Sequence, residues 1–163
     1  MNNPKPAPLS FATEKYFGVN AFKFRAADGK ETFIRYRIIP DEYAILSKED
    51  LESKSESYLF DEISERLQKG PATLKLVAQL AEEGDTTDDA TVHWPEERKV
   101  VELGVIKLEE VEGNAESMKE QKHIIFDPIP RVEGVEASAD PLLDMRAAVY
   151  LLSGRSRRAA PAE

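Results

Sequence analysis

Apolar residues recur at every second position in segments spread along this chain, and this pattern constrains its fold more than any other feature. The clearest example is ATLKLVAQLA at residues 72–81, where one side carries Leu74, Leu76, Ala78 and Leu80. A period of two is typical of a β-strand with one buried face. KVVELGVIKLEEV at residues 99–111 is rich in β-branched side chains and predicts another strand.

Two further strands are predicted nearer the N-terminus, at residues 19–25 and 31–39. Asp28-Gly29 lies between them and is a strong hairpin signal. In the second of these strands one side is a core side, formed by Thr32, Ile34, Tyr36 and Ile38. The other side is largely charged, because it carries Phe33, Arg35 and Arg37.

Helices are predicted between and after these strands. Residues 47–69 contain two helical patterns that stop at Gly70-Pro71. A last helix is expected from Asp140-Pro141 to about Leu152, and the polar stretch 112–121 is a loop or a short helix. Four amphipathic antiparallel strands would leave both outer edges of a barrel unpaired. The expected fold class is therefore α+β, with about half of an antiparallel β-barrel and peripheral helices.

The composition excludes several classes of function. A length of 163 residues suits one ordinary domain, and the net charge of −9 would repel phosphate backbones, so nucleic-acid binding is not expected. The absence of cysteine excludes disulfides, thiolate metal sites and cysteine catalysis. His93 and His123 are the only histidines and share no motif, so we interpret each as a surface or core residue. No apolar run is long enough to span a membrane.

One pair of residues in the last predicted helix has a chemical interpretation. In DPLLDMRAAVYLLSGRSRR, Arg146 and Tyr150 stand four positions apart, and residues at this spacing are neighbours on a helix. A cation that donates a hydrogen bond to a phenol favours the phenolate, which is the form of tyrosine that ferric haem accepts as an axial ligand. The alternative is that Arg146 lies on the surface and Tyr150 packs on the core with its hydroxyl at the rim.

Longer strings around this pair resemble successive blocks of one protein family. They are YFGVNAFKF (16–24), YLFDEISERLQKGPATLKLVAQLAEEGD (58–85), TDDATVHWPEERKVVELGVIKL (87–108) and FDPIPRVEGVEASADPLLDMRAAVY (126–150). In this order they look like small catalase-related haem peroxidases of the catalase family, and they cover nearly the whole chain. The leader with PKPAP and SFA at residues 4–12 resembles a run from the interior of such proteins. The likeness therefore corresponds to the C-terminal half of a family member.

The resemblance implies a fold, a cofactor and site residues. The fold would be an eight-stranded antiparallel barrel of the catalase type, with helices around buried haem b. Tyr150 would be the proximal iron ligand, and Arg146 would polarise it. Arg157, seven positions after the tyrosine, would contact a haem propionate, with Arg155 as an alternative. The implied activity is consumption of hydrogen peroxide, with a second peroxide or an organic electron donor oxidised.

Parts of the family's active site have no counterpart in these residues. The distal histidine that handles the peroxide proton is expected upstream of the first residue, and neither His93 nor His123 matches it. The distal asparagine of larger catalases falls near Lys15, so the distal site and the first half of the barrel are expected to be missing. General acid–base help is worth about 10²- to 10⁴-fold. Activity of this chain alone is therefore not expected.

The expected organisation is an extended leader at residues 1–15, the C-terminal part of the barrel with the proximal haem helix at 16–154, and a basic tail at 155–163. The expected partners are hydrogen peroxide, an organic electron donor, and either a second copy of the chain or a complementing N-terminal half. The expected location is cytoplasmic as written, or periplasmic if a signal peptide lies in the missing part.

Two alternatives stay open at the level of sequence. One is a non-enzymatic fragment or pseudoenzyme, an acidic β-rich module with weak or no haem binding. The other is a lipocalin-like ligand binder, for which four strands are too few.

Overall fold

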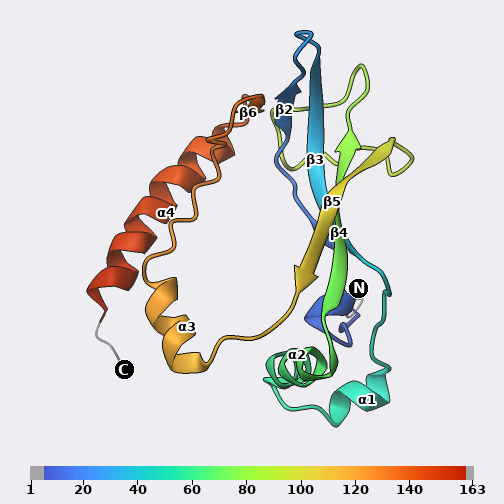
Figure 1. The fold of residues 1–163 in the computed structure, drawn as a ribbon. Coiled ribbons are helices and arrows are strands. Elements are labelled where there is room, and N and C mark those ends of the chain that lie inside the picture. Colours follow the sequence, from blue (N-terminus) through green and yellow to red (C-terminus); the bar gives the residue numbers. More distant parts are fainter. Residues whose placement is uncertain (1–5, 161–163) are drawn as a thin grey trace. The chain divides into compact units, whose positions relative to one another are not determined.

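The computed structural model describes residues 6–160, without the side chains of residues 114–116 and 118. In this part of the chain six strands form one sheet with the order β5-β4-β3-β2-β6, and β1 pairs with β3 (Figure 1). The strands are β1 (Tyr16–Phe17), β2 (Phe22–Arg25), β3 (Glu31–Pro40), β4 (Ala72–Leu80), β5 (Val100–Leu108) and β6 (Val135–Ala137). The helices are a short 3₁₀ helix (Phe11–Thr13), α1 (Lys48–Glu52), α2 (Tyr58–Lys69), α3 (Asn114–Gln121) and α4 (Pro141–Ala159).

The α+β class and the open antiparallel sheet are confirmed. β2 pairs antiparallel with β3 on one side and with β6 on the other, and each of the four predicted strands has its counterpart. The hairpin turn has Gly29 at a φ of 85°, which glycine adopts without steric cost. The Asp28 side chain accepts a hydrogen bond from the Lys30 backbone at 2.9 Å and closes the turn.

Two strands escaped the sequence pattern because they are too short to show a period. β1 has two residues and β6 has three. Side chains rather than an alternating sequence hold β6 in place, since Glu136 contacts Lys23 at 2.8 Å and Arg25 at 2.9 Å. β6 therefore depends on partners that lie more than 100 residues earlier in the chain.

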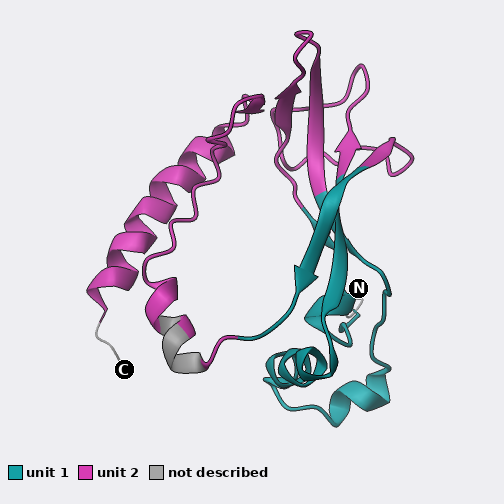
Figure 2. Cartoon of the chain, viewed as in Figure 1, with its two compact units in different colours: residues 1–17, 37–77, 102–111 teal, residues 18–36, 78–101, 112–163 magenta. Residues whose placement is uncertain are grey.

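The chain forms two compact units that alternate along the sequence (Figure 2). Unit 1 comprises residues 1–17, 37–77 and 102–111, and unit 2 comprises residues 18–36, 78–101 and 112–163. In unit 1 the ring of Phe60 on α2 meets Phe11 edge-on at 5.4 Å. Unit 2 holds the hairpin turn, the loop between β4 and β5, and the helices α3 and α4. This division cuts across the long strands β3, β4 and β5.

The expected extended leader has local structure within its described part. Ser10 and Thr13 cap each other around the 3₁₀ helix, and the Ser10 and Ala12 side chains are buried. The Leu46 and Leu9 backbones bond to Ala7 and Ala44 respectively, which fixes this segment along residues 44–46. The leader is ordered because its serine and threonine hydroxyls satisfy backbone groups. Residues 1–5 lie outside the described part.

The expected basic tail at residues 155–163 is mostly helical, because α4 continues past Leu152 to Ala159. A single glycine, Gly154, costs a helix only about 1 kcal/mol and does not end it. The arginines of the last turn are favourable next to the negative end of the helix dipole. The helix stops at Ala160, whose ψ is 140°, because the residue before a proline is pushed out of the helical region. Residues 161–163 lie outside the described part.

Burial in unit 2 extends to the side of β3 that the sequence predicts to be charged. Arg35 is only 6% exposed, and on the part of β4 that belongs to unit 2 both Ala78 and Gln79 are buried. Arg35 is buried because its guanidinium stacks on the Trp94 ring at 4.4 Å and donates to the Val92 carbonyl at 2.8 Å. Residues of the loop between β4 and β5 thus cover Arg35 on the side of β3 that the sequence predicts to be largely charged.

Candidate functional site

Helix α4 carries the residues singled out by the sequence, and its start is fixed by Asp140. The Asp140 carboxylate accepts a hydrogen bond from the Leu142 backbone at 2.9 Å, and Pro141 occupies the first turn. Both are favourable at a helix N-terminus, where backbone donors lack partners and proline has none to lose. One side of the helix carries Leu143, Arg146, Tyr150, Gly154 and Arg157, at spacings of three or four. Leu143 is 1% exposed and anchors this side.

Arg146 and Tyr150 are in direct contact in the middle of this side. The Arg146 Nε donates a hydrogen bond to the Tyr150 hydroxyl oxygen at 3.2 Å. The guanidinium carbon also lies 5.4 Å from the centre of the tyrosine ring. Both side chains are half-buried. The structure therefore brings together the two residues of the R-x-x-x-Y pair, with the hydroxyl oxygen as the acceptor.

Asn20 and Asp140 extend this pair into the protein interior. Arg146 Nη1 donates to the Asn20 amide oxygen at 2.5 Å, and Asn20 Nδ2 donates to Asp140 Oδ2 at 2.9 Å. Asn20 is 3% exposed and Asp140 is 5% exposed, so this hydrogen-bonded chain is enclosed. Buried polar groups of this kind hold their partners in one geometry. The guanidinium of Arg146 is thus fixed from the side opposite to Tyr150.

The sequence interpretation missed Asn20 and saw Asp140 only as a helix start. The string YFGVNAFKF contains Asn20, but a lone asparagine beside a predicted strand carries no local signal of a contact 126 residues away. Only the pairing of β2 with β6 brings the two segments together.

Arg157 lies two helical turns from Tyr150, and the structure does not bring it to the Arg146–Tyr150 pair. Its Nη1 donates to the Gln121 carbonyl at 2.5 Å and its Nη2 to the Ile124 carbonyl at 2.7 Å. The guanidinium also stacks on the Phe126 ring at 5.0 Å. A guanidinium has five N–H donors, so three remain for a carboxylate. Arg155, the alternative, is exposed.

The other residues weighed in the sequence lie apart from this pair. His93 and His123 are both exposed. Lys15 stacks over the Tyr43 ring at 4.7 Å within unit 1. In the part of the chain that the structure describes, no group of three or more His, Asp or Glu side chains could hold a metal ion. Among the same residues, no helix combines the length and the apolar character needed to cross a bilayer.

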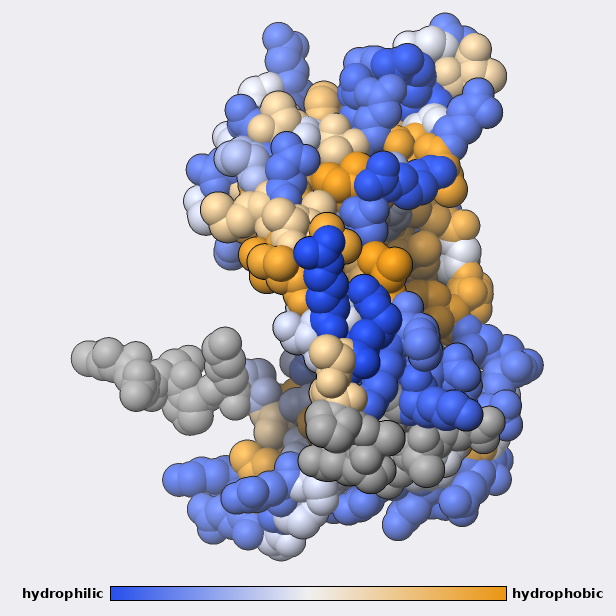
Figure 3. Space-filling model, turned by 90° about the vertical axis from the view of Figure 1, so that its left-hand side faces the viewer, coloured by the Kyte–Doolittle hydropathy of each residue, from blue (hydrophilic) through white to orange (hydrophobic). Residues whose placement is uncertain are grey.

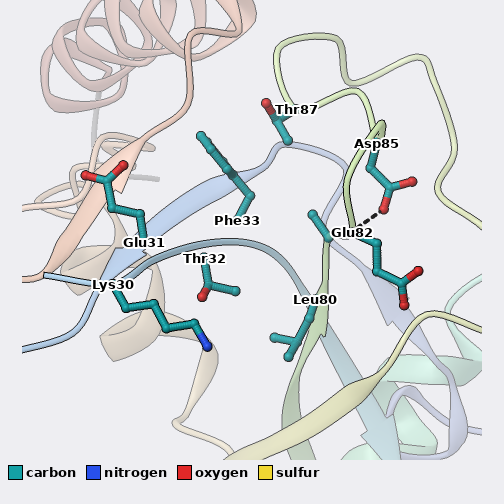
Figure 4. A pocket seen from close by; sticks show the side chains of 9 residues that line it. Lys30, Glu31, Thr32, Phe33, Leu80, Glu82, Asp85 and Thr87 are labelled. Carbon is teal, nitrogen blue, oxygen red and sulfur yellow. Dashed lines mark hydrogen bonds between the residues drawn. The ribbon is translucent and has the colours of Figure 1, made fainter. Parts of the chain in front are cut away.

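A pocket of about 540 Å³ lies elsewhere in unit 2, at the hairpin end of the sheet (Figure 4). Its lining comes from the turn, β3, β4 and the following loop, namely Lys30, Glu31, Thr32, Phe33, Leu80, Ala81, Glu82, Asp85 and Thr87. Arg98 binds the Asp85 carboxylate through two nitrogens, at 2.9 and 3.0 Å, and lowers the pKa of Asp85. The acidic groups here are therefore paired, and we find no chemistry to assign to this pocket.

The comparison with protein families decides which family this chain belongs to. The model of the catalase family matches residues 2–162. The chain belongs to the catalase family. A catalase-related peroxidase from Mycolicibacterium paratuberculosis is 35% identical over 153 residues, which are 92% of this chain and 47% of that protein. Another from Synechococcus elongatus is 31% identical, with 96% of this chain and 45% of that protein covered. This catalase-family chain thus spans about half the length of these relatives.

Solved catalases have the same fold. A fungal catalase superposes with a TM-score of 0.77 at 24% identity, covering 92% of this chain and 32% of that protein. Catalase A from Saccharomyces cerevisiae gives the same TM-score at 23% identity, covering 92% of this chain and 33% of that protein. The open sheet of this catalase-family chain is therefore consistent with part of a barrel.

Proposed function

We propose that this chain is the haem-ligating half of a catalase-related peroxidase, with Tyr150 as the proximal ligand of the iron. The observation that carries the proposal is the hydrogen bond from Arg146 Nε to the Tyr150 hydroxyl oxygen at 3.2 Å. The catalase family uses haem in general, and bound haem supplies the iron chemistry that reduces hydrogen peroxide.

The residues present fit an axial tyrosine. In this family a tyrosine oxygen binds ferric iron as the phenolate. A guanidinium that donates to the same oxygen favours that form, and arginine stays charged under all ordinary conditions. Arg146 would hold the Tyr150 hydroxyl oxygen in position through its Nε hydrogen bond. The Tyr150 side chain is half-buried, so part of it reaches the surface.

Asn20 and Asp140 would keep Arg146 in this position. Arg146 has one nitrogen on Tyr150 and another on Asn20, so its planar fork is fixed between two oxygen acceptors. Asp140 holds the amide of Asn20 with the oxygen toward Arg146. These residues act through Arg146 and do not touch the ligand site themselves.

Arg157 would bind a haem propionate with the donors that its two carbonyl contacts leave over. Its side of α4 is that of Tyr150, and a spacing of seven residues is about 10.5 Å along a helix. Arg157 would then hold the segment 121–126 and a carboxylate together.

The test is titration of the purified chain with hemin, followed by the visible spectrum. The expected result is saturable binding with a high-spin ferric spectrum that Tyr150→Phe abolishes. Tyr43→Phe is the matched control, because Tyr43 is exposed and lies in unit 1. An unchanged spectrum and affinity in Tyr150→Phe would contradict the ligand assignment.

Turnover is a separate question from ligation. No counterpart of a distal histidine is identified, so we propose that peroxide decay by this chain alone is negligible and is gained with a complementing N-terminal half. Co-expression with such a half should restore decay of hydrogen peroxide. Brisk decay by the chain alone would show that it assembles its own proton-transfer group.

A second candidate function, a non-enzymatic module that binds another polypeptide, is favoured by the exposed apolar side of α4. Met145 is 64% exposed and Leu152 is 59% exposed, and Leu142, Val149 and Leu151 are exposed as well. Hydrophobic residues also reach the surface on the face seen in Figure 3. Exposed apolar residues at helical spacing suit a protein partner. The hemin titration separates the two candidates, since this one requires no haem.

A further inference from the structure

A buried cation on β3 lies outside the site described so far. Arg35 is 6% exposed, and its guanidinium stacks on the Trp94 ring at 4.4 Å. It donates to the carbonyl oxygens of Val92 at 2.8 Å and Asp89 at 3.2 Å. Its Nε is buried and has no hydrogen-bond partner among the described residues. No carboxylate of this part of the chain forms an ion pair with it within 4.0 Å.

Asp140 is a buried carboxylate that, like the Arg35 guanidinium, has no ion-pair partner among the described residues. Its carboxylate is 5% exposed and accepts hydrogen bonds from the neutral donors Asn20 Nδ2 and Leu142 N, at 2.9 Å each. Within residues 6–160 it forms no ion pair. Burying a carboxylate without a compensating positive charge is costly. The dipole of α4 supplies part of this compensation, and a nearby cation would supply more.

The strand register places Arg35 on the same side of the sheet as Ala21 and Ser138, and Ser138 lies two residues before Asp140. β2 pairs Phe22 with Ile34 and with Ala137. The next row therefore contains Arg35, Ala21 and Ser138, and the Ser138 backbone donates to the Ala21 carbonyl at 3.4 Å. Alternation puts these three side chains on one side. Asp140 follows two residues later, with its backbone N–H 3.4 Å from the Ser138 hydroxyl.

The middle position of this row is small and enclosed. Ala21 is 1% exposed, and its side chain is a single methyl group. Strands lie about 4.8 Å apart, so an arginine can reach across one strand. Burial lowers the pKa of Arg35, and the Asp140 carboxylate is the strongest of the nearby charges that oppose this shift.

We propose that Arg35 is a positioning residue for the proximal site: its buried charge compensates Asp140 across Ala21 and so fixes Asn20, Arg146 and the first turn of α4. This role rests on the proposed function where it concerns haem. The contact between Arg35 and the loop that precedes β5 then joins that loop to the start of α4. No other role described above involves both the loop before β5 and the start of α4.

The test is a double-mutant cycle with amide hydrogen exchange of the haem-free chain as the readout. The variants are Arg35→Met, Asp140→Asn and both together, because asparagine caps a helix as well as aspartate does. Arg35→Met should speed exchange of the Leu142 and Leu143 amides by at least about tenfold, and by much less when Asp140→Asn is already present. An equal effect in both backgrounds would overturn the proposal.

Controls separate positioning from general loss of stability. Arg35→Lys keeps the charge and should retain most of the protection, which also covers the case in which Arg35→Met does not fold. Asp127→Asn removes a carboxylate that Arg131 binds at 2.7 Å and should show no coupling to Arg35→Met. Exchange that rises only in residues 86–94 would overturn the proposal, since Arg35 would then hold the loop alone.

The hemin titration tests the proposed function separately from the coupling between Arg35 and Asp140. If Tyr150→Phe leaves the ferric spectrum unchanged, the ligand assignment fails, while the exchange cycle still tests the Arg35–Asp140 coupling. If Tyr150 is the ligand, Arg35→Met should alter the ferric spectrum and Arg35→Lys should restore it. A spectrum unaffected by Arg35→Met would contradict the effect on Arg146.

Discussion

Asn20 shows how one short side chain connects two distant segments. Its amide oxygen accepts from Arg146 and its amide nitrogen donates to Asp140, so both ends are used. An amide suits this position because it offers an acceptor and a donor on one rigid plane. A carboxylate would lack the donor for Asp140, and an ammonium would lack the acceptor for Arg146. The chemistry of the residue is therefore set by its two charged neighbours.

Replacement of this side chain should therefore be costly. In Asn20→Ala, Arg146 Nη1 and Asp140 Oδ2 lose their partners in a buried site. An unsatisfied buried polar group costs about 1–3 kcal/mol, so the free energy of unfolding should fall by about that amount or more. Chemical denaturation measures this change. Gln121→Ala is the control, because its amide is exposed and donates to the Ser117 hydroxyl, and a comparable loss there would contradict the expectation.

At the scale of elements, β6 has ion pairs to β2 in addition to backbone pairing. Lys23 contacts both Glu136 at 2.8 Å and Glu31 at 3.3 Å, and Arg25 contacts the same two carboxylates. Alternating charges on neighbouring strands stabilise the pairing. Because β6 leads directly to Asp140 and α4, its attachment to β2 determines where the helix begins.

This arrangement predicts acid sensitivity of the β2–β6 pairing. The hydrogen bond from Lys23 lowers the pKa of Glu136 below its ordinary value of 4.5. A lowered pKa contributes stability above the ordinary value, and this contribution is lost as the pH falls through the folded-state value. Thermal unfolding between about pH 6 and pH 3 should show a decline that is shallower in Glu136→Gln. An identical pH profile in the variant would argue against this role of Glu136.

In the described part of the molecule, the sheet is open with β5 and β6 as its outer strands, and apolar residues are exposed at the surface. β5 ends the strand order, and its Leu103 and Val105 side chains are exposed. Exposed strand edges and apolar side chains favour association with other chains. The chain of the fungal catalase is about three times longer than the part that this chain matches, since the match covers 32% of it. Exposure of this kind is expected where a chain spans only part of a fold.

The chain should therefore associate with itself in a concentration-dependent manner. Val149→Lys changes an exposed residue of α4, so it should reduce association without a loss of folded structure. Light scattering over a concentration series measures the change. Leu143→Lys is the contrasting variant, because Leu143 is buried and the charge should unfold the helix contact. Equal scattering by Val149→Lys and the unmodified chain would show that this side of α4 is not involved.

Much of the architecture follows from local rules that act over a few residues. Alternation predicts the four longer strands, Asp28-Gly29 predicts the hairpin turn, and Asp140-Pro141 predicts the start of α4. The spacing of Arg146 and Tyr150 also predicts their contact, because neighbours at four positions meet on any helix. These features need no knowledge of the rest of the chain.

The tertiary structure decides what lies beyond that range. Asn20 reaches Arg146 across 126 positions, and Arg35 reaches the Val92 carbonyl across 57. Arg157 binds the Gln121 and Ile124 carbonyls, which no spacing in the sequence indicates. The sequence alone determined the four longer strands, the start of the last helix and its Arg146–Tyr150 pair, because hydrophobic periods and turn chemistry are local. The burial of Arg35 and the partners of Arg146 were decided only by folding, because strand pairing brings distant segments into the same enclosed space.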